Sequence, residues 1–549
     1  LDLLVREAEG NPFYLLEMLR FLQEQGFLEQ HGGVWRLTRP LSEVNIPQTV
    51  LGLVMRRVER LDPLSRELLD WGAVMGQRVD PRLLAQVSGM PLMAVMRHLH
   101  RVAQDHGLIA ADEEAFHFSH AKVQQALYEA MPSFMRRESH RLLGQAIEAR
   151  AQAGEKVDVY ALARHFAQAG DAPRGYRYSL LAADQAEAAL AFEEAAGHLR
   201  QALDMLDAAP GLAEGPSQRL QLTHRLGRIL LSIGRFEAAL SALQEALPLS
   251  QALADRAAEA DIALDIGMVH GRLGEWKEML RWGDQSLQLA ETLQDPERIV
   301  RALTSTGFHA FEGGDWALAA ERLSRAEALA QAKGLALLEA RAAGNRAILE
   351  NARGHHPEAL RLLQSSIATF RRLGMTMDVA RGLNNMGMAH YAMGDFAQAR
   401  ACYREALEIF GRMGDVREQG IAHLHLAEVA LAEEALEEAR AHCVQAVRRF
   451  SRLGFELGIA DVGRVYGGIA AHEGRIAVAE RYLREALAIY EAHGDSLNVA
   501  ETRQTLALLL EKAGKAYEAQ EHLDQSRIIY RALLDAAEGE PPEHDNPGG

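Results

Sequence analysis

The chain has 549 residues, of which 48% are apolar and 6% aromatic, and its net charge is −17. A chain of this length does not fold around one core, so several domains or a repeat array are expected. Nearly all of the excess negative charge lies after residue 150, and an acidic surface repels phosphate backbones, so we expect no nucleic-acid partner.

The first 150 residues predict helices interrupted by short strands. Residues 13–25 carry apolar side chains at helical spacing, and residues 34–37 read as a short strand after two glycines. Further helices are predicted at 48–60, 63–75, 80–88, 91–104, 120–131 and 134–151. Residues 108–110 and 115–118 flank three acidic residues and predict a two-stranded hairpin. Helices followed by a hairpin are typical of a winged helix.

Three segments of this region resemble one family, the STAND-type signalling ATPases. These are relatives of the maltose-regulon activator and of bacterial AAA-type ATPases associated with cyclases or kinases. EGNPFYLLEMLRFL (residues 9–22) resembles the lid that follows their ATP-binding core. Residues 46–76 and 116–147 are similar to the linker into their winged helix and to its end. The resemblance implies a lid remnant at 1–30 and a winged-helix-like domain at 31–152.

The resemblance also implies nucleotide contacts in a full-length protein. Gly10 and Pro12 match the family's Gly-x-Pro turn, whose proline packs against adenine, and His120 matches its β-phosphate-sensing histidine. The family often has an acid after that histidine, where this chain has Ala121. The alternatives are structural: Gly-Asn-Pro is also a good helix start, and His120 also fits the start of an ordinary helix.

The chain lacks the G-x-x-x-x-G-K-[ST] loop whose backbone amides hold nucleotide phosphates. We therefore expect no enzyme activity and no cofactor in this chain. ATP or ADP with Mg is expected only with an ATPase core upstream in the same chain. The sequence begins at Leu1 in a helical pattern, which we interpret as a fragment of a longer protein.

From residue 215 a glycine recurs every 40 residues. The series runs through Gly234, Gly274, Gly314, Gly354, Gly394, Gly474 and Gly514, with Glu434 in the one exceptional unit. Small residues recur seven positions before this glycine and five and twelve positions after it. A mid-helix glycine costs about 1 kcal/mol relative to alanine, so its recurrence at one phase predicts close helix contact. Each unit is predicted to be helix, tight turn, helix.

This spacing resembles the tetratricopeptide repeat, in a long form of 40 residues. The regular array is predicted over 215–535, with irregular helical repeats at 153–214 and a disordered tail at 536–549. The expected fold class is all-α, with a winged-helix-type N-terminal region followed by a right-handed α-solenoid of about 8–10 tetratricopeptide-like helix pairs.

In the repeat family, the first helix of each unit lines a concave groove. Transferring the family's groove positions to the central units predicts a site for a protein or peptide ligand, because asparagine and arginine side chains hold peptide groups and carboxylates. The predicted residues are Phe308, Phe311, Arg341, Asn345, Arg381, Asn384, Asn385, Met388 and Tyr391. The alternative is that they cap neighbouring helices or face solvent.

The remaining side-chain patterns predict little chemistry. Cys402 and Cys443 lie about one repeat apart and are expected to be reduced residues in or near the core. No histidine cluster has the spacing of a metal site, and no run of 18 apolar residues predicts a membrane span. We expect a cytoplasmic protein without a membrane partner.

Two functions remain open from the sequence. One is the sensor half of an ATP-dependent STAND-type switch, in which a protein, a peptide or a small inducer binds the repeats, and this binding releases ADP upstream and permits nucleotide-dependent oligomerisation. The other is a stand-alone tetratricopeptide scaffold for protein complexes, without nucleotide dependence.

Overall fold

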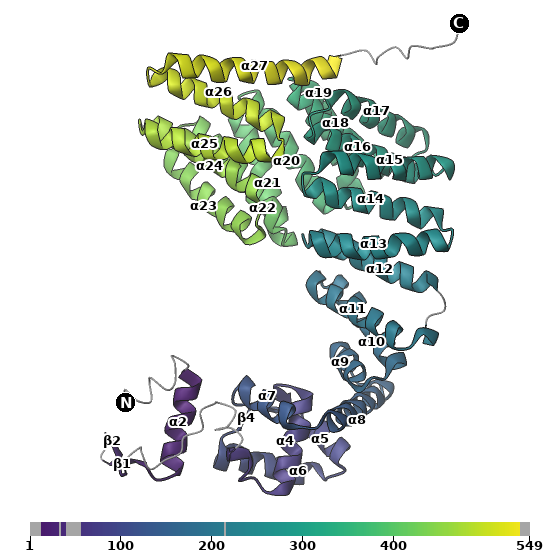
Figure 1. Ribbon diagram of the computed structural model, residues 1–549, viewed down its shortest axis with the longest axis vertical. Helices are drawn as coiled ribbons and strands as arrows, with labels where there is room; N and C mark the ends of the chain where they lie inside the picture. The colour runs from purple at the N-terminus through teal and green to yellow at the C-terminus, as the bar shows by residue number, and fades with distance from the viewer. Residues whose placement is uncertain (1–11, 32–33, 40–55, 213–215, 539–549) are drawn as a thin grey trace. The chain divides into compact units, whose positions relative to one another are not determined.

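The computed structural model describes residues 12–31, 34–39, 56–212 and 216–538 (Figure 1). The chain divides into two compact units, residues 1–215 and 216–549.

Unit 1 begins with a helix and a hairpin. Helix α2 (Pro12–Glu24) is followed by strands β1 (Leu28–His31) and β2 (Val34–Leu37), which pair antiparallel. The predicted helix and the strand at 34–37 are confirmed. Strand β1 was not predicted, because its sequence LEQH is mostly polar and its pairing with β2 is what defines it.

The next part of unit 1 is a set of helices with a small sheet. Its elements are α4 (Pro63–Met75), β3 (Arg78–Val79), α5 (Pro81–Ser88), α6 (Leu92–Arg101), β4 (Ile109–Ala111), β5 (Phe116–Phe118), α7 (Ala121–Ala130) and α8 (Ser133–Gln152). The sheet is antiparallel in the order β3-β5-β4. The predicted hairpin and the helices from residue 63 onward are confirmed. The helix predicted at 48–60 lies mostly outside the described residues.

Two details of this part differ from the sequence prediction. The α-helix predicted at 91–104 ends at Arg101, and a π-helical turn covers Val102–His106. The two-residue strand β3 was not predicted, since a strand this short carries no periodicity and exists through its pairing with β5.

Unit 1 ends with three helices, α9 (Val159–Ala169), α10 (Ala172–Ala188) and α11 (Phe192–Ala208). One apolar core connects most of the unit, with Leu69, Leu99, Phe118 and Leu143 buried in it, and Phe166 of α9 joins the same core. Carboxylate N-caps begin several of these helices; Asp158, for example, accepts the backbone N–H of Tyr160.

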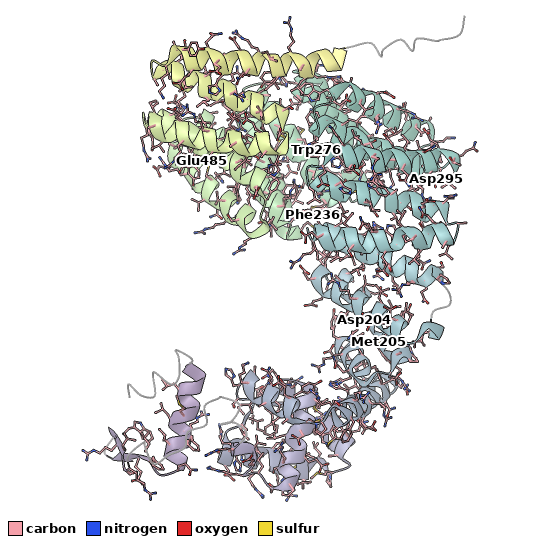
Figure 2. The ribbon with its side chains drawn as sticks, in the orientation of Figure 1. Asp204, Met205, Phe236, Trp276, Asp295 and Glu485 are labelled. Carbon is pink, nitrogen blue, oxygen red and sulfur yellow. The ribbon has the colours of Figure 1, made fainter. Side chains whose placement is uncertain are left out.

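The described part of unit 2, residues 216–538, forms eight helix pairs in a stack (Figure 1). The pairs are α12 (Pro216–Ser232) and α13 (Phe236–Ala252), α14 (Arg256–Arg272) and α15 (Trp276–Thr292), α16 (Pro296–Glu312) and α17 (Trp316–Ala332), α18 (Ala336–Ala352) and α19 (His356–Arg372), α20 (Thr376–Ala392) and α21 (Phe396–Met413), α22 (Val416–Ala432) and α23 (Leu436–Leu453), α24 (Glu456–His472) and α25 (Ile476–His493), and α26 (Ser496–Lys512) and α27 (Ala516–Glu538). Every first helix starts 40 residues after the previous one, so the predicted period is confirmed. Phe236 and Trp276 begin the second helices of the first two pairs (Figure 2).

The recurring glycine is the turn residue inside each pair, as predicted. All seven glycines of the series have positive φ, from 72° at Gly474 to 86° at Gly314. Glu434 takes the same left-handed conformation, with φ 59°. A second left-handed residue, Gly334 for example, joins each pair to the next. This second series was missed because its first two members are Ala254 and Gln294 rather than glycine.

The small residues of the first helices are required by close packing. A Cβ atom at Gly227 would lie 2.7 Å from the side chain of Leu243, and one at Gly387 would lie 2.5 Å from the ring of Tyr403. Real Cβ atoms do not approach neighbours this closely, so only glycine permits these helix pairs to pack at their present distance. The steric interpretation of the small positions is confirmed.

Successive first helices contact one another along the array, as α16 contacts α18 and α22 contacts α24. Helices on the inner side of a curved stack approach most closely, so the first helices line the concave face. The array also contacts itself across a larger distance in sequence, because α27 packs against α17. Helix α27 continues to Glu538, into the first residues of the segment predicted to be a disordered tail.

None of the helices in the described ranges is long and apolar enough to cross a membrane.

Candidate functional site

The concave face is held together by ion pairs between successive first helices. Arg341 of α18 donates to both carboxylate oxygens of Asp378 in α20, at 2.9 and 3.0 Å. Arg381 of α20 lies 3.6 Å from Glu418 of α22. The two partners of each pair are 37 residues apart, nearly one repeat. These two predicted groove residues are therefore already paired with side chains of the neighbouring first helix.

The predicted asparagines divide into two kinds. Asn384 is buried, and its side-chain oxygen accepts a hydrogen bond from Nδ1 of His425 at 3.0 Å. Asn345 and Asn385 occupy the same position in α18 and α20, one repeat apart, and are half-buried. Their amides have no hydrogen-bond partner within the described part of the chain. These two amides are free to bind a ligand.

The predicted aromatic and thioether side chains pack within their own repeats. Phe311 stacks on Trp316 with ring centroids 5.9 Å apart, and Tyr391 contacts Phe396 at 5.6 Å. Met388 packs beside Tyr391, and all of these predicted residues keep part of their surface exposed. Phe308 is also half-buried, against His309. Phe308 and Phe311 thus add apolar surface to helix α16, and Met388 and Tyr391 add apolar surface to helix α20.

Sequence reasoning missed a polar cluster farther along the same face. Arg464 of α24 donates to Glu428 of α22 at 2.9 Å and lies 3.5 Å from Glu501 of α26. The hydroxyl of Tyr490 donates to Asp461 at 2.6 Å, and burial raises the pKa of Asp461 to about 6. Burial also raises the pKa of Glu501. The sequence does carry a signal for this cluster, because Arg464 and Glu501 are 37 residues apart, the same spacing as Arg341 and Asp378.

The residues assigned by resemblance to nucleotide contacts lie in unit 1. Gly10 is outside the described residues, and Pro12 is the first residue of α2. His120 is the N-cap of α7, where its Nδ1 accepts the backbone N–H of Lys122 at 3.1 Å. The structure thus gives His120 a capping role, and its contact with nucleotide stays a prediction.

The two cysteines and the metal-ligating residue types form no reactive site. Cys402 and Cys443 are buried and free, and burial raises their thiol pKa to about 11 and about 12. Among the described residues, no three His, Cys, Asp or Glu side chains are arranged to hold a metal ion.

Comparison with known proteins identifies the repeat. The tetratricopeptide-repeat family matches at residues 338–412 and again at 220–252. The comparison with curated proteins gives no match.

Several solved structures are similar to this chain at low sequence identity. A Rap protein complexed with competence and sporulation factor is 14% identical, with a TM-score of 0.51, over 66% of this chain and 99% of its own. A Signal Transduction ATPase with Numerous Domains (STAND) protein with a tetratricopeptide repeat sensor, from Pyrococcus horikoshii, is 14% identical, with a TM-score of 0.40, over 97% of this chain and 70% of its own. The Rap conjugation gene regulator of plasmid pLS20, in complex with the Phr* peptide, is 13% identical, with a TM-score of 0.48, over 68% of this chain and 98% of its own. The chain contains tetratricopeptide repeats, arranged as a helical solenoid.

Proposed function

We propose that the concave face of the array binds an extended peptide or protein segment through Asn345 and Asn385. The single observation that carries this proposal is the pair of unpartnered amides at equivalent positions of adjacent first helices. Packed helices lie about 8–10 Å apart, which is about three residues of extended chain. Two such amides therefore match peptide groups about three residues apart, and each amide both donates and accepts.

The ion pairs beside these amides support the proposal. Arg341 and Arg381 are held by acids of the next helix, yet about half of each guanidinium-bearing side chain remains exposed. They fix the spacing of α18, α20 and α22, so the amides are positioned before a ligand arrives. Such preorganisation reduces the entropy lost on binding. The Rap protein that shares the fold is likewise described in a complex with a ligand.

The test is a selection of linear peptides on the full chain, followed by affinity measurement with variants. Asn345→Ala and Asn385→Ala are each expected to weaken a selected peptide about tenfold, the effect of losing an amide hydrogen-bond pair. Gln364→Ala is the matched control, because it removes an exposed amide from the second helix α19. Peptides whose affinity is unchanged by both asparagine variants, or is equally reduced by Gln364→Ala, would contradict the proposal.

We also propose that this array is the sensor of an ATP-dependent switch. The support is the resemblance of residues 9–22, 46–76 and 116–147 to STAND-type ATPases. Ligand binding must favour one conformation over another for such a switch to work. The gene sequence upstream of the Leu1 codon tests it. A phosphate-binding G-x-x-x-x-G-K-[ST] motif within about 250–300 residues, the size of one ATPase core, is expected. Its absence favours the stand-alone scaffold.

A further inference from the structure

A cavity of about 160 Å³ lies in unit 1. Its wall is formed by α4, α7, α8 and α9, and its polar lining comes from Gln124, Tyr128, His140, Arg164 and Gln168. A cavity of this size admits a ligand of several heavy atoms, since an engineered cavity of about 150 Å³ holds benzene. The polar lining distinguishes it from an apolar packing defect.

His140 lines this cavity, and His165 lies against His140 on the next helix. His140 and His165 are 3% and 1% exposed, and their Nδ1 atoms lie 2.9 Å apart. Burial lowers their pKa to about 4 and about 3. Both rings are therefore neutral near pH 7, and each carries a single proton on one nitrogen.

The hydrogen bonds then fix the position of each proton. Arg164 only donates, and its Nη2 lies 3.4 Å from Nε2 of His165, so that nitrogen is the acceptor. His165 consequently carries its proton on Nδ1 and donates to Nδ1 of His140. His140 carries its proton on Nε2 and donates to the Tyr128 oxygen at 3.0 Å. The hydroxyl hydrogen of Tyr128 is then left without an acceptor in the described part of the chain.

Arg164 lines the cavity, and Arg136 lies beside it, against the cavity-lining Tyr128. Arg164 donates to the backbone oxygen of Met75 at 2.5 Å, and the Arg136 guanidinium lies 5.1 Å from the centre of the Tyr128 ring. Across the described ranges, neither guanidinium forms an ion pair with a carboxylate. By contrast, Arg141 on the same helix as Arg136 is paired with Glu138.

We infer that this cavity binds a small oxyanion, with Arg164 and the Tyr128 hydroxyl as its donors and with the charge of Arg136 adding attraction from beside Tyr128. A site lined by an O–H donor and by a guanidinium group that has no carboxylate partner, with a second such guanidinium beside it, favours a negatively charged acceptor and disfavours a cation. Phosphate and carboxylate both meet this requirement, because both accept charge-assisted hydrogen bonds from arginine. The site lies outside the array, so it is independent of the peptide-binding proposal.

The test measures anion binding to the full chain by calorimetry, with ionic strength held constant by sodium chloride. One arm titrates inorganic phosphate and the other titrates acetate, so that the arms separate the two oxyanion sources. Saturable binding in either arm is expected, weakened about tenfold or more by Arg164→Gln, the effect of one charge-assisted hydrogen bond. Arg136→Gln is expected to weaken it less, because this change removes a neighbouring charge and not a direct donor.

Arg137→Gln is the matched control, because it removes the same charge from an exposed position next to Arg136. It is expected to leave the affinity unchanged. If circular dichroism shows that Arg164→Gln unfolds the chain, the anion affinity of Arg136→Gln is used to test the inference. The inference is overturned if neither anion binds saturably, or if Arg137→Gln weakens binding as much as Arg136→Gln.

Discussion

The side chain of Leu533 in the last helix lies against Gly314, the turn glycine of the third helix pair. A Cβ atom at Gly314 would be 3.2 Å from Cδ2 of Leu533, and Leu533 is only 5% exposed. Leu533 shares an apolar cluster with Trp316 and Leu349. The contact joins helix pairs that are far apart in sequence and closes the array on itself, as the approach of α27 to α17 in Figure 1 illustrates.

Replacing Leu533 with Asp is expected to open this contact without unfolding the helices. A carboxylate is too costly to bury against Trp316 without a partner, so α27 should leave α17. Amide hydrogen exchange in the first turn of α17 should rise, while the helical circular dichroism is retained. Ile528→Asp is the control, since Ile528 is 68% exposed on the same helix. Equal exchange in both variants would show that the contact does not hold the array closed.

Two glycines in first helices are expected to respond oppositely to alanine. Gly387→Ala should lower the free energy of unfolding by about 1–3 kcal/mol, because the new methyl group overlaps the buried Tyr403 ring. Gly344→Ala should raise it by up to about 1 kcal/mol, because Gly344 is helical with open space around it. Denaturant unfolding measures both. A stabilising Gly387→Ala would refute the close-packing interpretation of the small positions.

Glu434 provides a test of the turn conformation. A side chain costs about 1–2 kcal/mol in the left-handed region, so Glu434→Gly should stabilise the chain by about 0.5–1 kcal/mol. The reverse change, Gly474→Ala, should destabilise it by about 1 kcal/mol, since Gly474 has φ 72° and no neighbouring atom that a methyl group would meet. The thermal unfolding midpoints of the Glu434→Gly and Gly474→Ala variants are each compared with that of the unchanged chain. Shifts of the same sign would contradict the explanation.

Acid should destabilise unit 1 through its histidine pair. Arg136, Arg164 and Tyr128 face His140 and His165, and burial with the nearby guanidinium charges keeps both rings neutral in the folded state. Between pH 6.5 and about 3 the unfolded chain binds more protons than the folded one. The free energy of unfolding should therefore fall as pH falls, by up to about 1.4 kcal/mol per pH unit for each histidine.

The measurement is the NMR titration of the two imidazole C–H signals in the folded chain. Neither signal should titrate between pH 7.5 and 5. A midpoint near 6.5 for either ring would mean that it is solvated, and the proton arrangement derived for the cavity would then be wrong.

The sequence by itself determined the architecture of the array. The 40-residue recurrence of Gly234 and its equivalents specified where each turn lies, because a left-handed residue and a small packing position are local requirements of the chain. The hairpin at residues 108–118 was predictable for a similar reason, since alternation and an acidic turn are local signals. Strands β1 and β3 were not predictable, because their existence depends on a partner strand.

Only the tertiary structure decided which polar side chains are already hydrogen-bonded within the chain and which remain available to a ligand. Arg341 and Asn345 looked equivalent as groove residues, yet one is paired with Asp378 and the other is free. The closing contact of Leu533 with Gly314, like the meeting of His140 with His165, joins residues on different elements. Such contacts follow from the curvature of the stack and the packing of helices. The curvature of the stack is the sum of a small rotation at each repeat, and no local residue pattern encodes that sum.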